Sequence, residues 1–223
     1  MLKLIKANQK NFLSKLDIIL QKRKVQDSKI DQKVKNIIQD IKKNKDKALI
    51  KYEKKYSKLK NISLNNIKFS TSEKNKIIKK LDKKTKGSID LAFNRIFNFH
   101  KRQKLFSYSF KDKFKNFFAY RSTALNRVGV YVPGGRASYP SSVLMNCIPA
   151  LVAGVKEIYM TTPAMNNFYN PAVIYAAHKC GVKEIYKIGG SQAVAAMAYG
   201  TKTIQKVDKI VGPGNSFVAS AKK

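Results

Sequence analysis

The chain has 223 residues, of which 43% are hydrophobic, and it carries 46 Lys and Arg against 13 Asp and Glu, a formal net charge of +33. This length fits one large domain or two small ones with a packed core. No apolar run approaches the length of a membrane span, and residues 1–6 lack the long apolar stretch of a secretory signal, so we expect a cytoplasmic protein with no membrane partner. Cys147 and Cys180 both lie in apolar segments, and we expect buried free thiols in a reducing compartment.

The charge leaves one alternative open, a basic nucleic-acid-binding protein, because an excess of this size is typical of such proteins. Two features count against it. The basic residues are 40 Lys and only 6 Arg, whereas Arg is the side chain that best recognises phosphates and base edges. The sequence also has no recognised nucleic-acid motif and no basic face with interleaved aromatic residues. The excess is concentrated in residues 1–128, with 36 basic and 10 acidic residues, against 10 and 3 in residues 129–223.

The first hundred residues are predicted to be mainly helical. Residues 3–60 contain two apolar stripes at roughly helical spacing, with Lys-rich stretches between them: Leu13, Leu16, Ile19 and Leu20, then Val34, Ile37, Ile38 and Ile41. Ser70 followed by Glu73 is a capping-box pattern, which predicts the start of another helix. Its core face continues beyond Gly87 with Ile89, Ala92, Phe93, Ile96 and Phe97. His100 lies beyond this stripe, near a helix end, and is interpreted as structural rather than catalytic.

From Arg127 onward, short β-branched runs alternate with helical segments. The predicted strands cover residues 128–132, 158–161, 184–188 and 209–211, and the predicted helices cover residues 142–152, 171–181 and 193–199, with a last one from residue 216. Strand centres 24 to 29 residues apart leave room for one crossover helix, which forces neighbouring strands to be parallel. The sequence therefore predicts an α/β fold: a Rossmann-like, doubly wound parallel-sheet domain with crossover helices, preceded by a mainly helical N-terminal region.

Three of the four predicted strands end in paired or near-paired glycines, namely Gly134-Gly135, Gly189-Gly190, and Gly212 with Gly214. Glycine lets backbone amides approach an anion closely, and each turn leads into a helix N-terminus. Three such turns on one edge of a sheet indicate a site for an anionic ligand such as a dinucleotide, although each pair alone is also ordinary turn chemistry. Neither G-x-G-x-x-G nor a P-loop motif occurs, so spacing alone does not name the ligand.

Together these segments resemble the histidinol dehydrogenase family. The resemblance covers about residues 119–223 and rests on Gly129-Val130-Tyr131-Val132-Pro133-Gly134-Gly135, Tyr139-Pro140-Ser141-Ser142-Val143-Leu144-Met145-Asn146, Pro149-Ala150-Leu151-Val152-Ala153-Gly154-Val155, Gly189-Gly190-Ser191-Gln192-Ala193-Val194-Ala195 and Val207-Asp208-Lys209-Ile210-Val211-Gly212-Pro213-Gly214-Asn215. Residues 1–118 fit the family only in outline. The resemblance implies two domains: residues 1–126, a helical leader with the N-terminal part of a first incomplete Rossmann-like domain, and residues 127–223, a second Rossmann-like domain.

The resemblance also implies an activity. Family members are zinc-dependent homodimers that oxidise L-histidinol to L-histidine, the last step of histidine biosynthesis, by two hydride transfers to NAD. Three NAD contacts carry over to matching positions: Tyr131, Gln192 and Asn215. Their chemistry suits the role, because the phenol can pack on or hydrogen-bond a nucleotide and the two amides offer a donor and an acceptor each. The alternative is that each is a turn or cap residue.

The family's Glu-His acid–base pair and its zinc ligands lie downstream of the Gly-Pro-Gly-Asn turn, and the sequence ends eight residues after Asn215. We therefore expect an N-terminal half truncated in its second domain, with no catalytic or metal residues of its own and no activity alone. The only histidines, His100 and His178, do not match family zinc positions. His178 and Cys180, two residues apart on a helix, do not face the same way, so no metal site is expected there.

Overall fold

The chain is described by a computed structural model covering residues 6–57, 61–134, 139–164 and 168–223, with the backbone alone for residues 21–28. The N-terminal region is helical, as predicted, and consists of α1 (Phe12–Tyr56), α2 (Thr71–Ile78) and α3 (Lys83–Lys101). The predicted capping box opens α2: the Ser70 hydroxyl accepts from the Glu73 amide at 3.1 Å, and the Glu73 carboxylate accepts from the Ser70 amide at 2.8 Å. The predicted core face is divided between α2 and α3, and Gly87 lies inside α3.

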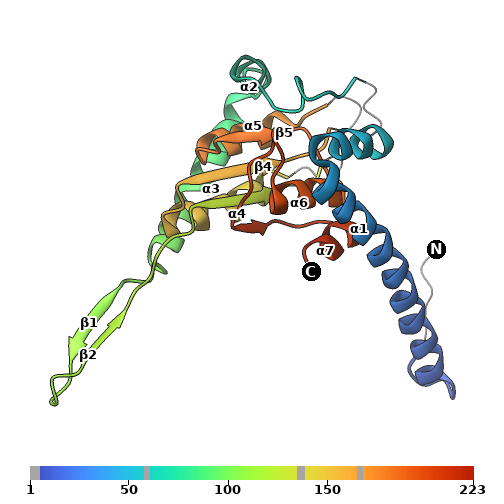
Figure 1. Cartoon of the computed structure of the whole chain (residues 1–223), viewed down its shortest axis with the longest axis horizontal. Helices are drawn as coiled ribbons and strands as arrows, with labels where there is room; N and C mark the ends of the chain where they lie inside the picture. The colour runs from blue at the N-terminus through green and yellow to red at the C-terminus, as the bar shows by residue number, and fades with distance from the viewer. Residues whose placement is uncertain (1–5, 58–60, 135–138, 165–167) are drawn as a thin grey trace.

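A four-stranded parallel sheet forms the centre of the molecule, in the strand order β5-β4-β3-β6 (Figure 1). Its strands are β3 (Arg127–Tyr131), β4 (Glu157–Thr161), β5 (Glu184–Tyr186) and β6 (Lys209–Val211), and the helices that follow them in turn are α4 (Pro140–Ala153), α5 (Pro171–Lys179), α6 (Gly190–Tyr199) and α7 (Ser216–Ala221). All three strand pairings are parallel. The predicted Rossmann-like fold with crossover helices is thereby confirmed.

Successive side chains along each strand point to opposite faces of the sheet, so the core has two layers. Val128 and Val130 of β3 face a cluster formed with α4 and α5, against which α2 and α3 pack. Tyr131, together with Tyr159 and Tyr186 of the neighbouring strands, faces the other cluster, which is formed with α6 and the second half of α1. Both cysteines lie in the first layer as buried free thiols, as expected. The division into domains at residue 127 stays a prediction, since helices from before that point pack on both faces of the sheet.

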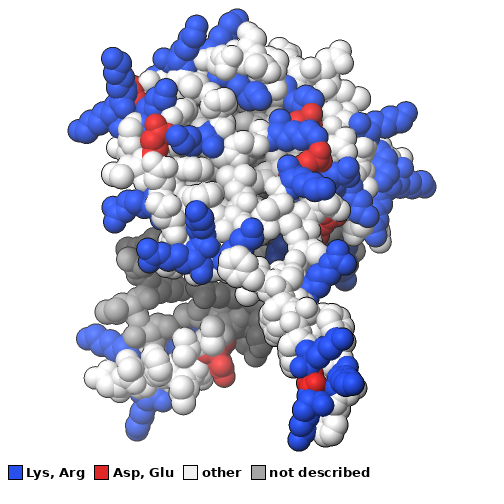
Figure 2. Space-filling view, turned by 90° about the vertical axis from the view of Figure 1, so that its left-hand side faces the viewer, with Lys and Arg blue, Asp and Glu red and all other residues white. Residues whose placement is uncertain are grey.

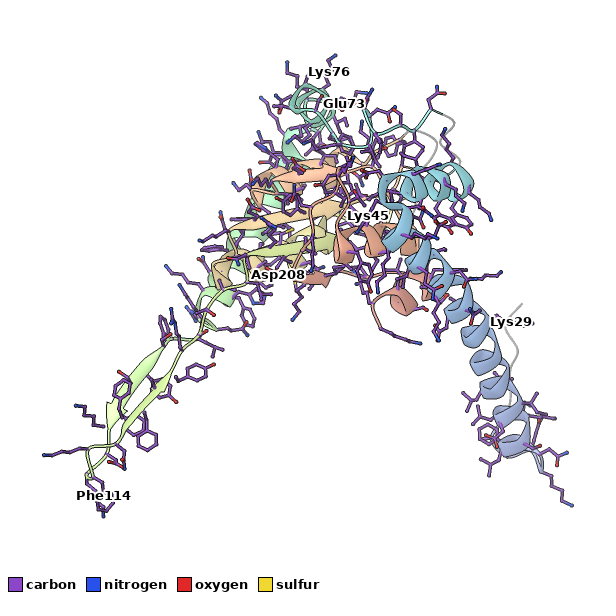
Figure 3. The ribbon with its side chains drawn as sticks, in the orientation of Figure 1. Lys29, Lys45, Glu73, Lys76, Phe114 and Asp208 are labelled. Atoms are coloured by element: carbon purple, nitrogen blue, oxygen red, sulfur yellow. The ribbon has the colours of Figure 1, made fainter. Side chains whose placement is uncertain are left out.

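Helix α1 bends at Lys45, where the backbone leaves the helical region (φ 48°, ψ −125°) (Figure 3). The N-terminal part of the helix projects away from the body, and Leu13 there is 75% exposed (Figure 1). Val34 and Ile41, from the second predicted stripe, are buried. Beyond the bend the helix packs along α6, and the Lys45 ammonium donates to the carbonyl oxygens of Tyr199 and Gly200 at 3.3 and 3.1 Å.

The N-terminal region also contains a β-hairpin, which differs from the prediction of a mainly helical region. Strands β1 (Tyr108–Lys111) and β2 (Phe117–Tyr120) pair antiparallel and project from the body, with Phe114 at the tip (Figures 1 and 3). The physical reason is local, because aromatic side chains stack directly across the two strands: Tyr108 on Tyr120, and Phe110 on Phe118. Asp112 closes the turn by accepting from the amides of Phe114 and Asn116.

The basic side chains are scattered over the face shown in Figure 2 rather than gathered into one patch. Several acidic residues pair with them at the surface, such as Glu157 with Arg127 and Lys183. None of the described helices is both long enough and apolar enough to cross a membrane.

Candidate cofactor site

A cavity of about 460 Å³ opens at the edge of the sheet where the parallel strands end. Its lining comes from the second half of α1 and from the segments that follow β3, β4, β5 and β6: Ile37, Glu53, Tyr56, Ser57, Tyr131, Pro163, Ala164, Gly189, Gly190, Ser191, Gln192, Asn215 and Phe217. The structure thus brings Tyr131, Gln192 and Asn215 together at one cavity, although they are far apart in the sequence. Gly135, which the sequence motif also includes, lies outside the described residues.

Tyr131 is the last residue of β3, and 5% of its surface is exposed. Its hydroxyl accepts a hydrogen bond from the Gly190 amide at 3.0 Å, which fixes the ring across the start of α6. Burial raises the pKa of the phenol, so the group is neutral over the physiological range. The Tyr131 backbone carbonyl is also closely approached, since a Cβ at Gly212 (φ +112°) would lie 2.0 Å from its oxygen. Only glycine allows β6 to end this close to β3.

Gln192 lies in the first turn of α6 and is buried. Its side-chain nitrogen donates to Glu53 Oε1 at 2.9 Å. Its side-chain oxygen lies over Gly190, where a Cβ would come within 2.7 Å of it. Gly190 has a φ of +65°, so glycine is needed there both for the backbone conformation and for the space that the Gln192 amide occupies.

Asn215 is the residue before α7, and its side-chain oxygen accepts from the Val218 amide at 3.1 Å. It is therefore the N-cap of α7, which is the alternative role considered for it. The residue is also exposed and lines the cavity, so its position fits a ligand contact as well. Next to it, the Lys222 ammonium donates to the Gly212 carbonyl and ties α7 to the turn after β6.

Glu53 is a site residue that the sequence did not indicate. Its side chain is fully buried near the end of α1, and Oε1 accepts from the Gly189 amide at 3.0 Å as well as from Gln192. No described Lys or Arg forms an ion pair with this carboxyl. Burial raises the pKa of this carboxyl to about 7, while hydrogen bonds from Gly189, Gln192 and Ser57 act in the opposite direction.

The amides of the Gly189-Gly190 pair are both used within the protein. Gly189 donates to Glu53 and Gly190 donates to the Tyr131 hydroxyl. A ligand at this turn therefore meets a phenol, a carboxyl and the Gln192 amide, rather than two unpaired backbone amides.

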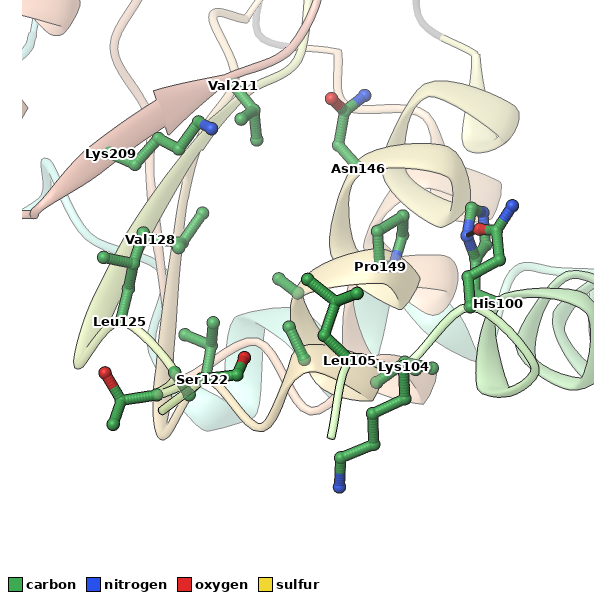
Figure 4. Close-up of a pocket in the computed structure, with 17 residues that line it drawn as sticks. His100, Lys104, Leu105, Ser122, Leu125, Val128, Asn146, Pro149, Lys209 and Val211 are labelled. Carbon is green, nitrogen blue, oxygen red and sulfur yellow. Dashed lines mark hydrogen bonds between the residues drawn. The ribbon is translucent and has the colours of Figure 1, made fainter. Parts of the chain in front are cut away.

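The described residues do not fit a zinc ion. Nowhere among them do three His, Cys, Asp or Glu side chains come together as a metal site requires. His178 is exposed on α5, whereas Cys180 is buried. His100 lines a second cavity of about 450 Å³ at the base of the hairpin, between α4 and the ends of α3 and β6 (Figure 4). There its Nδ1 lies 2.7 Å from the Gln103 side-chain oxygen.

A parallel sheet with helices on both faces, whose strand ends lie at one cavity, defines an α/β protein of the Rossmann-like class. The sequence profile of the family described as histidinol dehydrogenase matches residues 20–223. The chain belongs to this family.

Individual relatives agree. The chain is 52% identical over 223 residues to a histidinol dehydrogenase of Pelagibacter ubique, covering 100% of this chain and 51% of the relative. It is 42% identical over 217 residues to that of Sulfurimonas denitrificans, covering 97% and 50%. The crystal structure of histidinol dehydrogenase from Elizabethkingia anophelis superposes with a TM-score of 0.80 at 40% identity, over 86% of this chain and 44% of that one. The chain thus spans about half the length of the curated relatives it matches.

Proposed function

We propose that this chain forms the NAD-binding side of a histidinol dehydrogenase, which oxidises L-histidinol to L-histidine by two hydride transfers at the end of histidine biosynthesis. The observation that supports the proposal is that Tyr131, Gln192 and Asn215, the positions that match the family's NAD contacts, all line one cavity. A volume of about 460 Å³ lies within the usual range for small-molecule sites. NAD, when bound, supplies the hydride acceptor.

The residues that line the cavity can hold NAD in three ways. The neutral phenol of Tyr131 supports a flat ring, and its rigid link to Gly190 keeps it in place. Gln192 presents an amide oxygen as an acceptor, because its nitrogen is already committed to Glu53. Asn215 offers an exposed amide at the mouth of the cavity. All three contacts are neutral, which suits the ribose and amide groups of a dinucleotide better than its phosphates.

The zinc-dependent part of the reaction is a separate matter. The described residues contain no cluster fit for zinc, so we derive no step through that ion. Both histidines lie away from the cofactor cavity, and the described residues that line it include no His–carboxylate pair for acid–base work. We propose that the 223-residue chain alone binds NAD but does not oxidise L-histidinol, and that the working enzyme is a homodimer.

Calorimetric titration of NAD into the purified chain tests the cofactor assignment. We expect saturable binding at one site, weakened by Gln192→Ala and by Asn215→Ala. Asn146→Ala is the matched control, since it makes the same change in the second cavity. Binding that only Asn146→Ala weakens would move the site there. An assay of NAD reduction with L-histidinol and zinc should give no turnover, and measurable turnover would contradict the inactivity of the chain alone.

A further inference from the structure

Glu53 is unusual in a chain so rich in cations. The protein has 46 Lys and Arg, yet this fully buried carboxyl has no ion-pair partner among the described residues. Other carboxylates, such as Asp40 and Glu184, do pair with lysines. Burying an ionisable group without a counter-charge is unfavourable, and such groups concentrate at functional sites. Glu53 also lines the cofactor cavity, beside Gln192.

The position of the Glu53 carboxyl allows it to orient the Gln192 side chain. An ionised carboxylate can only accept hydrogen bonds, so Oε1 requires the Gln192 amide to turn its nitrogen inward, at 2.9 Å. The amide oxygen is then the atom of this group that lies nearest Gly190, which also lines the cavity. A protonated carboxyl can donate as well as accept, so it permits either orientation of the amide. Ionisation of Glu53 therefore selects one orientation of Gln192.

We propose that Glu53 is a positioning residue: its ionised carboxylate fixes the Gln192 amide with the oxygen toward the cavity, so that the affinity for NAD depends on this ionisation. The proposal rests on the proposed function of the cavity. The new element is a dependence of NAD binding on pH, which acts through Gln192 and the Gly189 amide rather than through contact with the reacting atoms.

The surroundings leave Glu53 as the group in this cluster whose charge changes near neutral pH. From β3 the Tyr131 phenol faces it, and from the segment before α5 the Tyr169 phenol does. Burial, followed by the nearby Glu53 charge, raises the pKa of both phenols, so they stay protonated. Helix α6 brings only the neutral groups of its first turn, and Ser57 lies one turn along α1. No described cation is among the groups that shift the Glu53 pKa, so none offsets the effect of burial.

Two measurements test the proposal. The first follows the Gly189 backbone amide and the Gln192 side-chain amide of the unliganded chain by NMR from pH 5 to pH 9. We expect both signals to titrate with one shared midpoint in the wild type, and neither to do so in Glu53→Gln. The second measures NAD affinity over the same range. We expect it to rise about fivefold or more with pH in the wild type, and to be flat in Glu53→Gln and in Gln192→Ala.

Glu184→Gln is the matched control, because it removes one negative charge outside the cavity and should keep the wild-type pH profile. An NAD affinity that falls with pH would overturn the proposal, since it would show the carboxylate repelling the dinucleotide phosphates. Amide signals that do not titrate together would overturn it too. If the amides titrate as expected but NAD binds at no pH, the proposed cofactor site fails and the link to affinity fails with it, whereas a pH-independent affinity overturns this proposal alone.

Discussion

A hydrogen bond of 2.9 Å between Gln192 Nε2 and Glu53 Oε1 joins the first turn of α6 to the end of α1. At the other end of the same helix pair, the Lys45 ammonium donates to the last carbonyls of α6. The two helices therefore run antiparallel, with a carboxyl at the N-terminus of α6 and a cation at its C-terminus. Both charges suit the helix dipole at their positions. A helix from early in the chain thus holds the cofactor side of the sheet at two points.

The free energy of unfolding should depend on pH through Glu53. The carboxyl has a pKa of about 7 in the fold against 4.5 as its ordinary value, so the folded state binds this proton more tightly. This contribution is fully present below about pH 4.5 and is lost as pH rises through about 7, a difference of roughly 3 kcal/mol. Urea unfolding at intervals from pH 5 to pH 8 should show this fall in the wild type relative to Glu53→Gln. A difference that grows with pH in favour of the wild type would contradict the burial argument.

Gly190→Ala and Gly181→Ala form a matched pair. Both glycines have a positive φ, of +65° and +64°, so each substitution strains the backbone by about 1 kcal/mol. Only the Cβ at position 190 would meet another group, the Gln192 side-chain oxygen at 2.7 Å, whereas position 181 is open. We expect Gly190→Ala to be the less stable variant in thermal unfolding and the only one of the two with weakened NAD binding. Equal effects of both on NAD binding would show that the Gln192 orientation is unimportant.

Tyr131→Phe removes the hydroxyl that accepts from the Gly190 amide. The Gly190 amide is only partly buried, so losing its partner should lower the free energy of unfolding by roughly 1 kcal/mol. NAD affinity should fall as well, because the start of α6 is no longer tied to β3. Tyr159→Phe removes a hydroxyl from the same sheet face, bonded to Glu157 away from the cavity, and should leave NAD affinity unchanged. Denaturant titration and calorimetry on both variants check this.

Lys45 combines a strained backbone with a useful side chain. Both Lys45→Ala and Lys45→Gly lose the hydrogen bonds to Tyr199 and Gly200, but only glycine relieves the positive φ of 48°. The glycine variant should therefore be more stable than the alanine variant by about 1 kcal/mol, although glycine is the poorer helix former. If the alanine variant unfolds at the higher denaturant concentration, α1 does not bend at this residue.

The four central strands could be predicted because each is a short β-branched run that ends at Gly or Pro, and because their spacing allows only parallel crossovers. The β1–β2 hairpin could not be predicted in the same way. Its side chains are exposed on both faces, so no alternation of apolar and polar residues marks it. The available signal was local: aromatic residues at alternate positions, such as Tyr108 and Phe110, on one side of a polar turn around Asp112.

The candidate site was predictable in its motif residues and not in Glu53. The stretch from Tyr52 to Tyr56 reads as a solvated, Lys-rich helix surface. One signal was present, because Glu53 falls four residues after the buried Leu49 and three before Tyr56, on the apolar side of the helix. An acidic residue at a core position indicates a partner from elsewhere in the chain, and the sequence alone does not show that the partners are Gly189 and Gln192.

The decisive experiment is calorimetric titration of NAD into the wild-type chain and into Gln192→Ala, at pH 8 and moderate salt. We expect saturable binding of one NAD per chain in the wild type and at least about tenfold weaker binding in the variant, with both proteins folded by circular dichroism. No binding to the folded wild type, or equal binding to both proteins, would contradict the assignment of this cavity as the cofactor site.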